Sequence, residues 1–268
     1  MRRASLAALA VVIVTGCGSS GSEEAAALLT DAAEETREAG SARLSLTTRI
    51  ELEGGEIMVS GEGAYDRDEG KSRLDYSLSG GEQTLGFELV LLGDVMYQRF
   101  PPLIAERDLP AGKPWVSYPL DEFALTFPAN VLSRLASDPT SLVFGAQEDS
   151  QVNRIGTDEI RGVETTRYRL ILDVPRRDEP SLDDQTRERL RELRESGVDD
   201  IVVEVWVDAE RLIRRADTRY ENAAFEGTTA DIQSSVELYD FGAEISVAPP
   251  AADEVTPHAE LVERAGQP

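Results

Sequence analysis

The sequence predicts an α+β protein built on one large antiparallel sheet, with about nine to eleven strands and a few helices on one face. Two observations predict the strands: apolar and polar residues alternate over many short stretches, and tight glycine- or aspartate-containing turns separate these stretches. A third observation predicts the helices. Two stretches rich in Ala, Leu, Glu and Arg are each followed by a glycine, the residue that commonly ends a helix.

The first sixteen residues have the three parts of a signal peptide. Arg2 and Arg3 give a positive start, residues 6–14 form an apolar run, and small residues precede Cys17. The run is too short to span a bilayer core, which takes about 20 apolar residues. Residues 14–17 resemble the bacterial lipobox, in which the cysteine thiol receives diacylglycerol and becomes the new N-terminus. We therefore expect residues 1–16 to be removed and Cys17 to be lipidated, on the extracytoplasmic face of the cell membrane. The alternative is an ordinary signal peptide that happens to contain a cysteine.

The first half of the mature chain predicts a helix followed by a meander of strands. Residues 17–24 hold the lipidated cysteine and a Gly/Ser linker. Residues 24–39 predict a helix that ends before Gly40. Strand patterns joined by tight turns then follow at residues 44–52, 57–65, 74–78, 85–91 and 95–97.

In the second half, the series of strand patterns and tight turns is first interrupted. Residues 101–128 combine prolines with aromatic residues, which predicts a loop that packs on an apolar surface. We expect helices at residues 129–136 and 182–195, and strands at residues 152–155, 165–174, 201–207, 212–220 and 232–238. One domain therefore spans residues 25–256, and residues 257–268 form a polar tail.

Composition argues against catalysis and against nucleic acid as a partner. His258 is the one histidine, whereas a catalytic triad needs a histidine beside a nucleophile and zinc sites use His and Cys. We expect no enzyme, no metal and no cofactor, although a carboxylate pair of the glycosidase type stays open because acidic residues are so abundant. The 27 basic and 51 acidic residues give a net charge of −24, which repels phosphates.

Three stretches carry a resemblance to a known family. They are residues 162–173, residues 205–208 with 212–215, and residues 239–242 ahead of Pro249 and Pro250. In this order behind a lipobox, the chain resembles the actinobacterial LppX/LprA/LprF/LprG lipoproteins over residues 25–256. The resemblance implies a half-barrel similar to the LolA/LolB carriers, in which helices enclose an apolar cavity. It also implies an acylated lipid or glycolipid as cargo, transfer across the cell envelope, and an envelope transporter as a partner.

The strand faces supply the candidates for such a cavity, because a large sheet under few helices has room for an apolar hollow; the alternative is that these faces form an ordinary packed core. A register slip of one residue would move the whole set to the other face. The candidate lining residues are Leu44, Leu46, Ile50, Leu85, Phe87, Leu89, Tyr168, Leu170 and Leu172, with Phe123 and Phe127 near the mouth. Two other interpretations stay open: an envelope sensor or regulatory module of the same fold that binds a protein partner, and an enzyme that acts on envelope polymers.

Overall fold

The computed structural model describes residues 18–120, 151–173, 191, 198, 200–225 and 228–265. Cys17, Phe123, Phe127, the side chain of Leu172 and the helix expected at residues 129–136 lie outside the described residues. The same holds for the helix expected at residues 182–195, of which Arg191 is described and helical.

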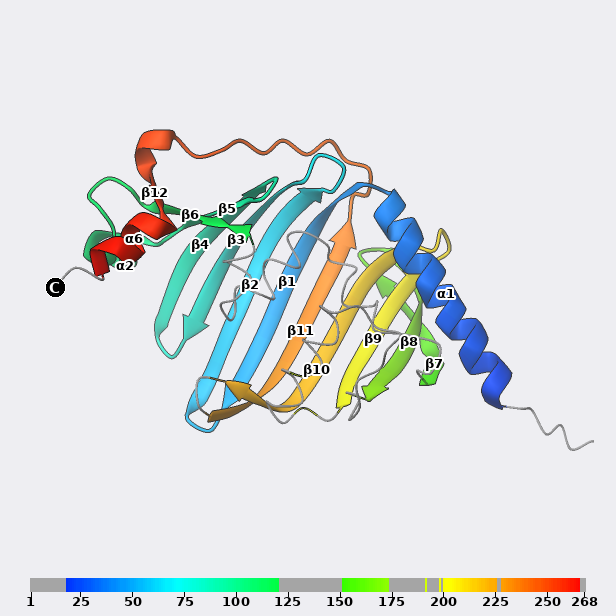
Figure 1. Cartoon of the computed structure of the whole chain (residues 1–268). Helices are drawn as coiled ribbons and strands as arrows, with labels where there is room; N and C mark the ends of the chain where they lie inside the picture. The colour runs from blue at the N-terminus through cyan, green and yellow to red at the C-terminus, as the bar shows by residue number, and fades with distance from the viewer. Residues whose placement is uncertain are drawn as a thin grey trace, which may run out of the picture.

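Twelve strands of the described chain form one sheet (Figure 1). The strands are β1 (Ser41–Leu52), β2 (Gly55–Asp66), β3 (Lys71–Gly80), β4 (Gln83–Leu92), β5 (Val95–Arg99), β6 (Trp115–Pro119), β7 (Gln151–Ile160), β8 (Val163–Asp173), β9 (Asp200–Asp208), β10 (Ile213–Phe225), β11 (Thr228–Tyr239) and β12 (Val255–Pro257). Their order is β12-β6-β5-β4-β3-β2-β1-β11-β10-β9-β8-β7, and every pair is antiparallel except β12 with β6. The edge strands β12 and β7 do not pair with each other in the described residues, so the sheet is open. The predicted α+β class with a large antiparallel sheet is confirmed.

Three α-helices are described: α1 (Gly18–Glu38), α2 (Pro102–Asp108) and α6 (His258–Ala265), with a single 3₁₀ turn η2 (Ala252–Glu254) before β12. None of the helices in the described ranges is long and apolar enough to cross a membrane.

Two expectations about strands and loops need correction. The sheet has one strand more than the upper expected number, because β6 comes from a segment expected as a loop and β12 from the boundary of the expected domain and tail, where no strand was expected. The proline-rich stretch contains α2 and β6, and Pro119 stands at the end of β6, where its missing N–H costs no interior ladder bond. Within the expected polar tail, residues 257–268, the structure has α6, and β12 lies at the boundary between the expected domain and this tail.

The linker expected up to residue 24 is also wrong, because α1 already begins at Gly18. The Ser22 hydroxyl accepts a hydrogen bond from the Val152 N–H at 3.1 Å, which ties the first turns of the helix to β7. At the other end, the buried Thr36 hydroxyl accepts from the Ile213 N–H at 2.9 Å and donates to the Ala32 carbonyl at 2.6 Å. Both ends of α1 are therefore fixed to the sheet.

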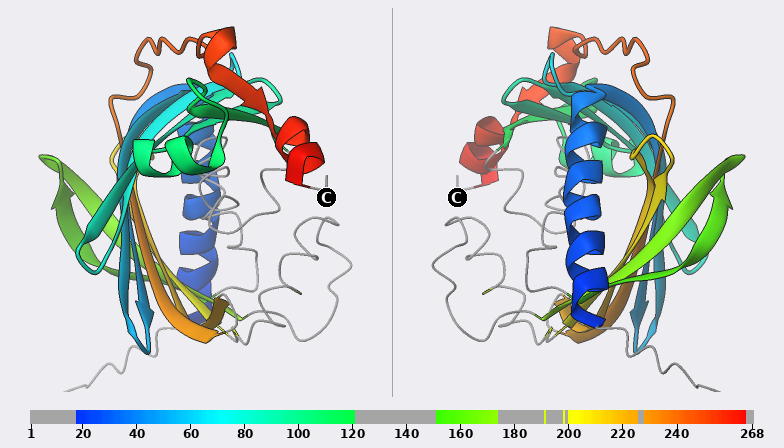
Figure 2. Two further views of the ribbon diagram at one scale, coloured as in Figure 1. Left: turned by 90° about the vertical axis from the view of Figure 1, so that its left-hand side faces the viewer. Right: turned by 90° about the vertical axis from the view of Figure 1, so that its right-hand side faces the viewer.

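The sheet is strongly curved, and α1 lies on its concave side (Figure 2). Two glycines of β2 permit part of this curvature. A Cβ on Gly61 would come within 2.9 Å of the Asp75 carbonyl oxygen, and one on Gly63 within 2.6 Å of the Arg73 carbonyl oxygen. Real side chains do not tolerate such contacts with backbone atoms, so β3 approaches β2 this closely only because β2 carries glycine.

The buried apolar residues form two clusters. In the first, Ala25, Leu29 and Ala32 of α1 pack on strands β7–β10, around residues such as Leu170 and Val203. The members of the second cluster come from strands β1–β5 and β11, and no helix residue is among them in the described chain: Ala42, Leu44, Leu46, Val59, Tyr65, Leu74, Tyr76, Leu89, Leu91, Met96, Val236 and Leu238.

Candidate functional site

Strand registers define two faces of the sheet. Directly paired residues of neighbouring strands point to the same side. The side that includes Leu46 also includes Val205 and Ala216, which pack in the cluster with α1, so it is the concave face. We describe the concave face as rows of residues that pair across neighbouring strands.

Four rows on the concave face run across the strands. They are Leu89–Leu74–Gly63–Leu44–Leu238; Phe87–Tyr76–Gly61–Leu46–Val236–Ala216–Val205–Tyr168; Leu85–Leu78–Val59–Thr48–Ser234–Thr218–Val203–Leu170; and Gly80–Ile57–Ile50–Ile232–Tyr220–Ile201–Leu172. These rows contain no charged residue between β4 and β8. The first charged residue along any of them is Arg154 of β7, which pairs with Tyr168 next to a bulge.

The convex face of the same strands is charged. The row through Ser45 reads Arg99–Glu88–Asp75–Glu62–Ser45–Glu237–Arg215–Trp206–Arg167. Thus the alternation in the sequence places nearly all charge of these strands on one side and leaves the other side uncharged and mostly apolar, with Thr48, Ser234 and Thr218 as polar residues in its third row.

The sequence-predicted cavity residues whose side chains are described all lie on the concave face. Leu44, Leu46, Ile50, Leu89 and Leu170 are each at most 2% exposed. Tyr168 is buried as well, whereas Leu85 and Phe87 are half-buried. The structure divides them between the two clusters: Tyr168 and Leu170 belong to the cluster with α1, and Leu44, Leu46 and Leu89 to the other.

An aromatic group on the concave face was missed in the sequence. The rings of Tyr76 and Phe87 stack with centroids 5.0 Å apart, and Phe100 meets Phe87 edge-on at 6.1 Å. Gln98 donates a hydrogen bond to the Tyr76 hydroxyl at 3.0 Å, and burial raises the pKa of Tyr76 well above its usual value. Tyr76 therefore stays neutral at physiological pH, in keeping with an uncharged face. Phe100 lies between the strand expected at residues 95–97 and the proline-rich stretch that begins at residue 101, and no periodic pattern there indicated its contact with β4.

The convex face is held by ion pairs and by arginines stacked on tryptophan. The guanidinium groups of Arg167 and Arg215 each lie 4.9 Å from the Trp206 ring centroid, and the Trp206 indole N–H donates to Asp158 at 2.9 Å. Glu204 accepts hydrogen bonds from Arg167 and Arg169. Because these charges are paired with one another, the face is a stabilising network rather than an unneutralised patch.

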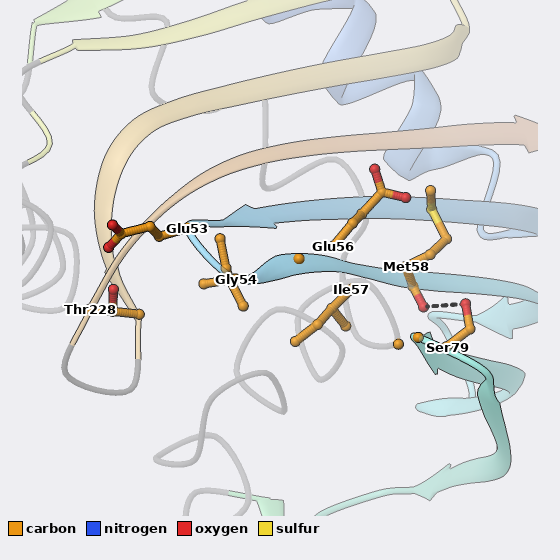
Figure 3. Close-up of a pocket in the computed structure, with 11 residues that line it drawn as sticks. Glu53, Gly54, Glu56, Ile57, Met58, Ser79 and Thr228 are labelled. Carbon is orange, nitrogen blue, oxygen red and sulfur yellow. Dashed lines mark hydrogen bonds between the residues drawn. The ribbon is translucent and has the colours of Figure 1, made fainter.

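A pocket of about 820 Å³ lies at one end of the sheet, where the β1–β2 and β3–β4 turns meet Thr228 (Figure 3). Leu52, Ile57 and Met58 are its half-buried apolar residues, and Gly54 and Gly81 are among the turn residues that line it. Figure 3 shows the side chain of Ile57 on the opposite side of β2 from Met58. The pocket therefore takes residues from both faces at the tip of the sheet.

A second pocket of about 810 Å³ crosses strands β1–β4 and reaches Phe100 and Pro101. Serine and threonine hydroxyls and the carboxylates of Glu62 and Glu88 contribute to its lining. The described residues contain no group of three or more His, Cys, Asp or Glu side chains that could hold a metal ion.

Comparison with known proteins gives a fold likeness only. No family model matches the chain, and no curated protein matches its sequence. The structure is similar to the lipoprotein LppX of Mycobacterium tuberculosis, with 13% identity and a TM-score of 0.49 over 83% of this chain and 98% of that one. For LprF of Mycobacterium bovis the values are 15% and 0.49, over 87% of this chain and 99% of that one. A putative outer membrane lipoprotein-sorting domain of Vibrio parahaemolyticus has 9% identity and a TM-score of 0.29, over 82% and 92% of the two chains. Likeness of this extent assigns no function.

Proposed function

We propose that the protein is a lipid-anchored lipoprotein that binds the acyl chains of lipids or glycolipids along its concave face and carries them across the cell envelope. The observation that supports this function best is the absence of charge from the concave rows between β4 and β8. A face of this width without charge suits a ligand that is apolar over a long stretch.

The physical basis is the cost of acyl chains in water. Each methylene group gains about 0.8 kcal/mol when it leaves water for an apolar surface. One charged side chain on that surface would oppose the transfer, because a buried charge without a partner costs several kcal/mol. The half-buried Leu78, Leu85 and Phe87 show that apolar area on this face is incompletely covered by the protein.

The anchor in this proposal is Cys17, which directly precedes the first residue of α1. Two or three acyl chains on one cysteine give stable attachment, whereas a single chain binds only marginally. The carrier would then work at the extracytoplasmic face of the cell membrane.

Native mass spectrometry of the full lipidated chain, isolated from membranes in mild detergent, tests the proposal. We expect co-purified lipid beyond the covalent anchor. Leu85→Lys places a charge on the concave face at a half-buried position and should reduce the bound lipid strongly. Thr84→Lys, one residue away on the exposed convex side, should leave it unchanged.

The competing interpretation is a regulatory module that binds a protein partner in the envelope. It is favoured if the wild-type protein carries no lipid and instead co-purifies in fixed stoichiometry with one membrane protein. Equal lipid content in Leu85→Lys and Thr84→Lys would also contradict binding along the concave face.

A further inference from the structure

The direction of α1 determines which end of the molecule lies next to the anchor. α1 has 21 residues and β1 has 12, so they extend over about 31 Å and about 40 Å. The chain reverses between them at Gly40, which has a positive φ of 72°. The start of α1 therefore lies at the same end of the sheet as the β1–β2 turn, and all views agree (Figures 1 and 2). We call this the turn end.

The connection between anchor and domain is short. α1 begins at Gly18, so no free spacer separates Cys17 from a helix that is fixed to the sheet near both of its ends. An acylated Cys17 would hold the turn end against the bilayer surface and keep it there, because the helix transmits the position of the anchor to the sheet.

We propose that the pocket at the turn end faces the bilayer and takes an acyl chain of a membrane phospholipid. This inference rests on the proposed function and on acylation of Cys17. The pocket has the size for part of a chain, about 820 Å³, and its apolar residues Leu52, Ile57 and Met58 are half-buried rather than sealed in the core. Ile57 belongs to the concave rows, so an acyl chain held here continues onto the apolar face.

The negative charge at the pocket rim favours contact with a zwitterionic bilayer over contact with an anionic one. Glu53 and Glu56 line the pocket and are exposed, and Arg49 pairs with Glu56 at 2.5 Å, so the rim charge is mainly that of Glu53. Carboxylates are repelled by an anionic lipid surface within about 10 Å at moderate salt. Zwitterionic phosphatidylcholine therefore serves as the lipid that the pocket engages best, and added phosphatidylglycerol should weaken the contact.

Photolabelling tests the inference. The lipidated full chain is reconstituted in phosphatidylcholine vesicles that contain a phosphatidylcholine with a diazirine at the end of one acyl chain, and labelled peptides are mapped by mass spectrometry. We expect label in residues 52–58, and less of it when phosphatidylglycerol is added. Gly54→Trp places a large side chain at the pocket rim, and its Cβ meets no heavy atom within 4 Å. Its label should fall about tenfold, the equivalent of 1.4 kcal/mol of lost contact.

The matched control is Gly86→Trp, an exposed strand glycine whose added Cβ also meets no atom within 4 Å and which does not line this pocket. It should be labelled like the wild type. Cys17→Ala should lose most label in residues 52–58, because the turn end is no longer held at the bilayer; unchanged label there would overturn the orientation. If the concave strands are labelled outside residues 52–58, and to the same extent in the wild type and in Gly54→Trp, the inference about the pocket is wrong but the proposed function stands. An absence of label together with an absence of lipid in native mass spectrometry would remove both.

Discussion

The two halves of the sheet bury the same concave face in different ways. On β7–β10 the cover is α1, whose small Ala25, Ala32 and Ala33 let the helix approach the strands closely. On β1–β5 none of the buried cluster members in the described residues comes from a helix, although the half-buried helical residue Leu120 packs against them, and the strands curve, with glycines at close contacts of β2 and β3. One half is therefore closed by a helix that is hydrogen-bonded to it, and we call the other the curved half.

Under the proposed function, this difference assigns a structural role to the helix-closed half and a binding role to the curved half. Most residues under α1 are packed against protein, and Leu29 and Leu170 are 0% exposed; Leu28, Tyr220 and Ile232 at the border of this cluster are half-buried. The half-buried apolar residues Leu78, Leu85 and Phe87 all belong to the curved half. We therefore expect substitutions under α1 to change stability, and substitutions on the curved half to change both stability and lipid content.

The largest effect is expected under the helix. Leu29→Ala removes a fully buried side chain between α1 and the strands, and it should lower the free energy of unfolding by about 3 kcal/mol, through lost transfer energy and the remaining cavity. Urea denaturation followed by far-UV circular dichroism measures the change. Leu103→Ala makes the same substitution at a position that is 63% exposed in α2 and should change stability very little. Equal losses of unfolding free energy in the two variants would contradict the claim that packing of α1 on the strands stabilises this half.

A smaller effect is expected at the bend of the curved half. Gly63→Ala sets a methyl group 2.6 Å from the Arg73 carbonyl oxygen, and a backbone atom cannot rotate away. We expect a loss of about 2 kcal/mol as β2 and β3 separate, accompanied by lower lipid content in native mass spectrometry. Gly54→Ala is the control, because its Cβ has no neighbour within 4 Å. A loss of stability with unchanged lipid content would show that the curvature does not serve binding.

The alternation of apolar and polar residues predicted which side chains of a strand are buried, but it did not predict which strands contact one another. The alternation in residues 44–52 and 85–91 correctly placed Leu44, Leu46 and Leu89 on one buried face, because period-two patterning follows directly from strand geometry. The face shared by all strands could not be read from sequence, since it depends on register across strands far apart in the chain, such as Thr48 with Ser234.

The elements that were missed are stabilised by non-local contacts. β12 has three residues and exists because β6 pairs with it in parallel. The start of α1 has the composition of a linker, with glycines and serines of low helix propensity, yet the Ser22–Val152 hydrogen bond ties its first turns to β7. The helical start directly after Cys17 could therefore not be predicted from the sequence.

The smallest expected effect is a difference in how stability depends on pH, set by one glutamate in each half. Glu204 in the helix-closed half and Glu88 in the curved half have equally exposed side chains, 13% each, on the convex face. Burial raises the pKa of both carboxyls. At Glu204 this is outweighed by hydrogen bonds from Arg167 and Arg169, so its pKa is lowered. At Glu88 burial prevails over Arg73, 2.9 Å away and shared with Asp75, so its pKa is raised.

The two shifts have opposite consequences for stability. A lowered folded-state pKa stabilises the fold above the unfolded pKa of about 4.3, and this contribution disappears as the pH falls through the folded value. A raised folded-state pKa stabilises the fold only while the group is protonated, and it becomes a cost as the pH rises through that value. At pH about 7, Glu204→Gln should therefore destabilise the protein and Glu88→Gln should stabilise it, each by less than about 1 kcal/mol. The urea midpoint of Glu88→Gln should approach that of the wild type as the pH falls below the unfolded pKa of about 4.3. The midpoint of Glu204→Gln should do so only as the pH falls through the lower pKa of folded Glu204. Shifts of the same sign in the two variants at neutral pH would mean that Arg73 pairs with Glu88 as effectively as the two arginines pair with Glu204.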